Sequence, residues 1–130
     1  MKKYIKGIQN MINVLAWFMF GLGIVHIIFG LIKFKAQIAG AISDGFVGKF
    51  RAPEARRTAF WFLIFGPMFM LAGHVAVHAV ATGDLALLKI LGVYSFATAL
   101  IGVAAFPKSP FWAALVISPL LIAAGFGYLR

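Results

Sequence analysis

Three histidines are the residues in this sequence most able to do chemistry, and all lie within long apolar stretches: His26, His74 and His78. An ionisable side chain is costly inside a membrane, so each histidine is a candidate functional residue. His74 and His78 are four residues apart, so their rings would project from one face of a helix and could share a metal ion. A third ligand would have to come from elsewhere, because the chain has no cysteine and its three acids lie in connecting segments.

A haem held between His26 and a histidine of the second stretch is disfavoured by depth. At 1.5 Å per residue, His26 lies about 6 Å beyond the middle of its helix, and His74 about 7 Å beyond the middle of its own. Antiparallel helices would direct these displacements to opposite faces, about 13 Å apart in depth. We therefore expect no cofactor within one chain. A metal ion at His74 and His78, or a haem shared between two copies, stays an alternative.

Aromatic and basic residues provide two further kinds of candidate ligand contact. Aromatic side chains could line an apolar pocket with His26 and His74, or could face lipid: Trp17, Trp61 and Tyr94. Arginines could bind a phosphate or carboxylate at the mouth of such a pocket, or could anchor the chain to lipid headgroups: Arg51, Arg56 and Arg57. The sequence contains no Gly-rich phosphate loop, catalytic triad or carboxylate pair, so it does not favour an enzyme.

The composition places these residues in a membrane protein. With 63% hydrophobic and 12% charged residues, and a mean hydropathy of +1.00, the chain could not cover a soluble core of its size with polar surface. Its net charge of +9 comes from basic residues at the ends of apolar stretches. That position favours contact with anionic lipid over nucleic acid, which we do not expect as a partner.

Four apolar stretches are each close to the roughly 20 residues that cross a bilayer, and they cover residues 11–31, 59–80, 85–106 and 111–129. Short connections after the second and third stretches require antiparallel neighbours. The sequence therefore predicts an all-α protein, a single transmembrane domain built as an up-down bundle of four transmembrane helices. Small residues at three- and four-residue spacing predict a close packing face on the third helix: Gly92, Ser95, Ala99 and Gly102.

The segment 36–57 is the one sizeable part of the chain outside these stretches. Large apolar residues recur in it at every fourth position: Ile38, Ile42, Phe46 and Phe50. This repeat predicts an amphipathic helix in the headgroup plane. Three glycines leave an irregular or re-entrant segment as the alternative: Gly40, Gly45 and Gly48.

Several short patterns resemble a family of small bacterial four-helix membrane proteins of unknown function. They are residues 21–26 with Gly30, residues 59–62 with Gly66 and His74, and the turn at residues 107–112. The resemblance implies a bacterial cytoplasmic membrane and no particular activity. Residues 30–34 also resemble the end of the first helix in DoxX-like membrane proteins. The face with the long loop has seven basic residues against five on the other, a difference too small for the positive-inside rule to decide the orientation. We expect the long loop to be cytoplasmic, with insertion in both orientations as the alternative.

Three functions are compatible with these features. The first is binding or transport of a small lipophilic or anionic molecule, with the histidines as polar contacts. The second is a metal or redox protein centred on His74 and His78. The third is a structural subunit of a homo-oligomer or a larger membrane complex, joined through small-residue faces.

Overall fold

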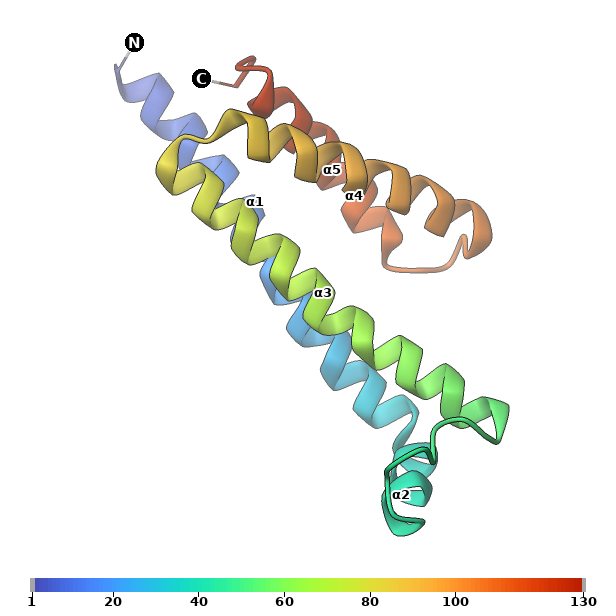
Figure 1. The fold of residues 1–130 in the computed structure, drawn as a ribbon. Coiled ribbons are helices and arrows are strands. Elements are labelled where there is room, and N and C mark those ends of the chain that lie inside the picture. Colours follow the sequence, from blue (N-terminus) through green and yellow to red (C-terminus); the bar gives the residue numbers. More distant parts are fainter. Residues whose placement is uncertain (1, 130) are drawn as a thin grey trace. The chain divides into compact units, whose positions relative to one another are not determined.

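The computed structural model describes residues 2–129 and contains, over that range, five α-helices and no strand (Figure 1). The helices are α1 (Lys2–Lys33), α2 (Lys35–Ser43), α3 (Glu54–Thr82), α4 (Leu85–Ala105) and α5 (Phe111–Gly125). The predicted all-helical class is therefore confirmed. The chain forms two compact units, of which one is Phe20–Leu71 and the other combines the chain up to Met19 with the chain from Ala72 onward.

Three of these helices, α1, α3 and α4, are long and apolar enough to cross a membrane. The predicted fourth span, residues 111–129, corresponds to α5, which is apolar but has only 15 residues. Its length of about 22 Å is less than the hydrocarbon thickness of about 30 Å. The helix ends early because Gly127 adopts a left-handed conformation (φ 80°), and the Tyr128 N–H then donates back to the Ala123 carbonyl at 3.0 Å.

A polar turn separates α3 from α4. Gly83 has φ 68°, which ends α3, and the Asp84 N–H donates to the Ala79 carbonyl at 2.9 Å. The Asp84 side chain then accepts a hydrogen bond from the Leu87 N–H at 2.9 Å and so caps the start of α4. This arrangement lets two apolar helices follow each other across a very short connection.

The helices α4 and α5 form an antiparallel pair that makes its closest backbone contacts at glycines. A Cβ atom at Gly92 would lie 2.8 Å from the Ile122 backbone nitrogen, and one at Gly125 would lie 2.6 Å from that of Lys89. Such distances leave no space for a side chain, so the two backbones approach closely. The predicted small-residue face is buried at Gly92, Ala99 and Gly102, while Ser95 is partly exposed.

Within Phe20–Leu71, the second half of α1 packs on the first half of α3 in a similar way. A Cβ atom at Gly23 would lie 2.6 Å from the Met70 nitrogen and 2.7 Å from the Gly66 carbonyl oxygen. Gly30 faces the side chains of Phe62 and Leu63 instead. Glycine therefore sets the closest approach in both helix pairs.

Segment 36–57, predicted as an amphipathic helix, is helical in α2 and again from Glu54, where α3 begins, but not between these helices. After Ser43 the chain forms a series of turns, and we refer to residues 44–51 as the 44–51 turn. Gly45, Phe46 and Gly48 all have positive φ values, which no continuous helix allows. The four-residue repeat of apolar side chains therefore does not correspond to one helix. The irregular alternative describes its second half.

Candidate functional site

His26 lies at the contact between α1 and α3, where it bonds to the backbone of α3. Its Nε2 atom is 2.8 Å from the Phe62 carbonyl oxygen. A carbonyl oxygen can only accept, so the His26 Nε2–H group is the donor. The imidazole also stacks on the Phe62 ring, with 4.1 Å between centroids, and meets the Phe69 ring edge-on at 5.4 Å.

A proline interrupts the backbone hydrogen bonding of α3 close to the His26 contact. Pro67 has no N–H group, so the Leu63 carbonyl receives no bond from it within the helix. His26 binds the carbonyl of the preceding residue, Phe62, and so adds a donor beside the interruption. This geometry gives His26 a definite role in joining two helices, through one hydrogen bond and two ring contacts.

His74 and His78 lie farther along α3, and both side chains are exposed. The Thr82 hydroxyl donates to the His78 backbone carbonyl at 2.9 Å, a bond that leaves the imidazole uninvolved. Among residues 2–129, no three His, Cys, Asp or Glu side chains are grouped so that they could hold a metal ion. A metal at this pair would need ligands from outside the described residues.

The aromatic residues singled out from the sequence all have exposed side chains. The exposed fraction is 51% for Trp17, 57% for Trp61 and 73% for Tyr94. They come from three different helices, and none of them lines the one hollow that we describe below.

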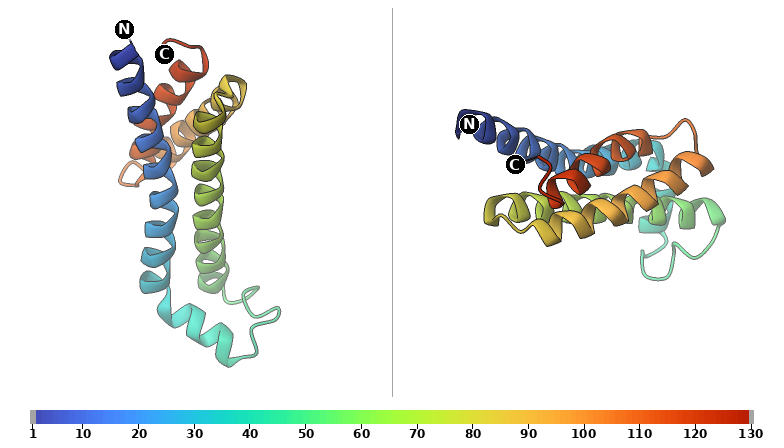
Figure 2. Two further views of the ribbon diagram at one scale, coloured as in Figure 1. Left: turned by 90° about the vertical axis from the view of Figure 1, so that its left-hand side faces the viewer. Right: turned by 90° about the horizontal axis from the view of Figure 1, so that it is seen from above.

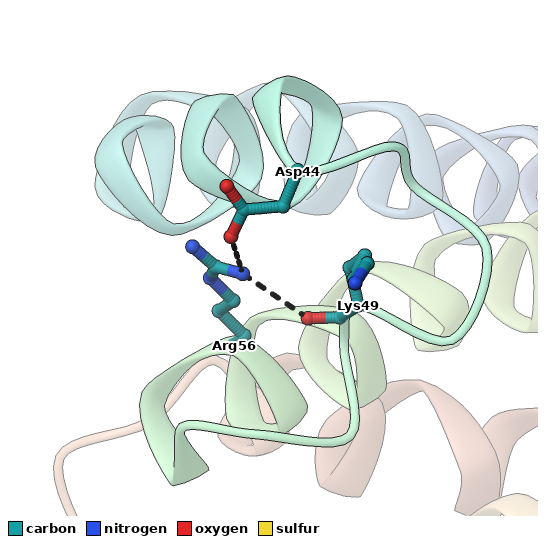
Figure 3. A network of polar contacts seen from close by, with 3 residues as sticks. All are labelled: Asp44, Lys49 and Arg56. Carbon is teal, nitrogen blue, oxygen red and sulfur yellow. Dashed lines mark hydrogen bonds and ion pairs between the residues drawn. The ribbon is translucent and has the colours of Figure 1, made fainter.

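Arg56 makes polar contacts within the folded chain. Its Nη1 atom donates to the Asp44 carboxylate at 2.8 Å and to the Lys49 carbonyl at 3.4 Å (Figure 3). Only 17% of the Arg56 side chain is exposed. The guanidinium thus ties the 44–51 turn to the first turn of α3, a use that the sequence pattern did not reveal because Asp44 is twelve residues away.

The other two arginines of this segment are open to solvent. Arg57 lies 3.7 Å from the Glu54 carboxylate in an exposed pair, which contributes little to stability. Arg51 is exposed and forms no ion pair among the described residues. Of the three predicted anion contacts, Arg51 is therefore the most available.

A shallow, open apolar groove lies on the α4–α5 pair. It has a volume of about 310 Å³. Its lining comes from one residue of α4 and five residues in or just after α5: Phe96, Pro119, Ile122, Ala123, Phe126 and Tyr128. The sequence alone does not reveal this groove, because the groove depends on how the two helices align.

Lys89 stands beside this groove. Its Nζ atom lies 4.3 Å from the centroid of the Phe126 ring, over the face of an aromatic side chain that lines the groove. Among residues 2–129, Lys89 has no acidic partner. It is the only basic residue within the predicted third span, and this position in an apolar stretch is the signal by which the sequence marks it.

A model of the family of unknown function DUF6463 matches residues 10–126. The chain belongs to this family. No curated protein and no solved structure matches it. The match spans nearly the whole chain and includes the His26 contact, the Arg56 ion pair and every lining residue of the α4–α5 groove except Tyr128. The predicted membership of a family of unknown function is confirmed, whereas the DoxX likeness and the bacterial origin stay predictions.

Proposed function

We propose that this member of DUF6463 is a four-span integral membrane protein that binds a small anionic amphiphile in the α4–α5 groove. The proposal narrows the expected ligand, a small lipophilic or anionic molecule, to one that is both. The observation that carries it is the position of Lys89, a cation with no acidic partner among residues 2–129, beside a groove lined by apolar side chains.

The exposed side chains support a membrane setting. Ile101 is 70% exposed and Leu100 is 53% exposed on α4, a helix that is long enough to cross a bilayer. Such surfaces are unfavourable in water and favourable in lipid. In this setting α5 and residues 126–129 would complete the fourth span of an up-down bundle, and segment 36–57 would lie at the cytoplasmic face of a bacterial membrane.

The groove has dimensions that suit a single short hydrocarbon chain. Its volume of about 310 Å³ is at the lower end of the range for small-molecule sites, roughly 300–1,000 Å³. Phe96 is the α4 residue that lines the groove, and it is seven residues from Lys89. The two residues are therefore about 10 Å apart along the helix. A tail lying along the groove would therefore place its head near Lys89.

Lys89 can pair with the head of such a molecule. The cation now lies against the Phe126 ring, an interaction of about 0.5–1 kcal/mol when exposed. A carboxylate or phosphate could bind the ammonium group by a charge-assisted hydrogen bond, which is stronger than a neutral one. The flexible lysine side chain could make that bond while its methylene groups remain on Phe126.

Binding of dansyl-undecanoate, a fluorescent fatty acid, to the protein in a non-ionic detergent tests the proposal. We expect saturable binding of this probe and weaker binding of its uncharged methyl ester. Lys89→Gln should lower the affinity for the acid about fivefold, the equivalent of roughly 1 kcal/mol. Ala123→Phe should abolish binding of both probes, because the new ring fills the groove.

Two variants provide the controls. Lys108→Gln removes an exposed lysine from the opposite end of the α4–α5 pair and should bind like the wild type. His74→Ala removes a ligand contact that the sequence predicted, and we expect it to bind normally. Loss of binding in His74→Ala but not in Lys89→Gln would overturn the groove as the site, and no saturable binding by the wild type would overturn the function itself.

A further inference from the structure

The 44–51 turn presents its apolar side chains outward. Val47 is 86% exposed, Phe46 is 57% exposed and Ile42, at the end of α2, is 59% exposed. In water such a group of side chains would be a site of aggregation or of binding. Their exposure therefore points to an environment other than bulk water.

The turn is a defined conformation that holds these side chains in place. Phe46 has φ 61°, a left-handed value that is costly for an aromatic residue. Its N–H donates to the Ala41 carbonyl at 2.8 Å, and its carbonyl accepts from the Lys49 N–H at 3.1 Å. The Phe46 ring also meets the Phe50 ring edge-on at 5.3 Å. These contacts and the Arg56–Asp44 ion pair stabilise the left-handed backbone conformation of Phe46. In this conformation the Val47 side chain is exposed.

The segment that contains the turn has more basic residues than acids. Residues 33–57 contain six basic residues and two acids. Both acids are paired, Asp44 with Arg56 and Glu54 with Arg57. Four basic side chains thus have no acidic partner among residues 2–129: Lys33, Lys35, Lys49 and Arg51. Two of these four, Lys49 and Arg51, belong to the turn itself and are exposed, so the turn can accept anions.

The position of the turn identifies the partner. The turn follows the end of α1 at Lys33 and precedes the start of α3 at Glu54, so it lies at one end of the α1–α3 pair of Phe20–Leu71 (Figure 2). Both helices are long and apolar enough to cross a membrane. The end of such a pair is at the level of the lipid headgroups.

We infer that the 44–51 turn is an interfacial anchor that inserts Phe46 and Val47 among the lipids of the protein's own membrane, while Lys49 and Arg51 bind anionic headgroups. Apolar insertion combined with basic side chains is the usual chemistry of such anchors. The anchor would fix the depth of α1 and α3. This inference rests on the membrane placement proposed above and is independent of the groove and its ligand.

A single-cysteine fluorescence experiment tests the anchor, and the chain suits it because it contains no cysteine. Val47→Cys carries a bimane label at the tip of the turn, and Ile101→Cys carries one on α4. Each protein is reconstituted into phosphatidylcholine vesicles with or without phosphatidylglycerol. The lipids carry bromine, a quencher, near the headgroup end of their chains or deep within them.

We expect the label at position 47 to be quenched by shallow bromines, and more strongly when phosphatidylglycerol is present. Replacing Lys49 and Arg51 by glutamine in the same protein should remove the added effect of phosphatidylglycerol. The label at position 101 should be quenched by lipid bromines in every vesicle. Quenching at 101 combined with a label at 47 that responds only to aqueous iodide would overturn the anchor alone. Absence of lipid quenching at both positions would overturn the membrane placement as well.

Discussion

The α1–α3 pair of Phe20–Leu71 and the α4–α5 pair are built alike at their closest points and differ in how they use their polar groups. Backbones approach through Gly23 in the first pair and through Gly92 in the second. In the first, the His26 ring is bonded to a backbone carbonyl of the neighbouring helix. In the second, Lys89 lacks an acidic partner among residues 2–129 and stands beside a groove.

This difference shows what a polar residue in an apolar stretch can mean. His26 drew attention in the sequence because of its cost inside a membrane, and the structure meets that cost with an internal hydrogen bond. Lys89 was less prominent, yet it retains the capacity to bind an outside anion. A polar group can bind a ligand when it has no partner within the folded chain. The depth of its residue in the membrane does not show whether it has one.

The largest effect should come from Gly23→Ala, because its methyl group would meet the Met70 nitrogen and the Gly66 carbonyl, neither of which can move without separating the helices. We expect a loss of about 1–3 kcal/mol in the free energy of unfolding, measured by titration with dodecyl sulfate in mixed micelles. Gly21→Ala is the matched control, since a Cβ there meets nothing within 4 Å. Equal stability of the two variants would contradict glycine-mediated contact in this pair.

A smaller effect is expected for His26→Phe, which keeps an aromatic ring against Phe62 and Phe69 but removes the hydrogen bond. Hydrogen bonds between membrane helices contribute about 0.6 kcal/mol on average and up to about 1.7 kcal/mol. The same unfolding titration should show a loss within that range. A variant as stable as the wild type would show that the rings, and not the bond to the Phe62 carbonyl, join the helices.

Asp44→Asn should change stability by less than about 1 kcal/mol, because its ion pair with Arg56 is half exposed on the acid side. Its effect should be local. We expect faster tryptic cleavage after the exposed Lys49 and Arg51, since the ion pair restrains the turn that contains them. Cleavage after Lys108, in the exposed α4–α5 connection, should proceed at the wild-type rate. Unchanged cleavage at all three residues would mean that the ion pair does not restrain the turn.

The smallest effect is expected for Ser118→Ala in the α4–α5 pair. Ser118 is fully buried, and its hydroxyl has no hydrogen-bond partner among the described residues. Removing an unpaired polar group should leave stability unchanged or raise it by up to about 1 kcal/mol. A clear loss of stability in the unfolding titration would show that this hydroxyl forms a hydrogen bond. Ser118 would then stabilise its helix pair as His26 stabilises the α1–α3 pair, and the two pairs would not differ in this respect.

Local features of the fold could be predicted from the sequence, and features that depend on tertiary contact could not. The apolar spans and the small-residue face at Gly92 and Ala99 follow from periodicity within one helix. The bond from His26 to Phe62, the ion pair of Arg56 and the groove beside Lys89 join residues that are distant in sequence. The left-handed Phe46 could not be foreseen either, because glycine is the residue that normally adopts such a conformation.

The most direct test of the proposed function is to map where a photoreactive fatty acid attaches. A single-chain fatty acid with a diazirine in its tail is bound to the purified protein, irradiated, and located by mass spectrometry of the resulting peptides. We predict adducts on Phe96 and on residues 119–128, reduced by competing undecanoate and in Lys89→Gln. Adducts concentrated around His74 or Trp17, or spread evenly over the apolar surface without competition, would contradict a binding site in the α4–α5 groove.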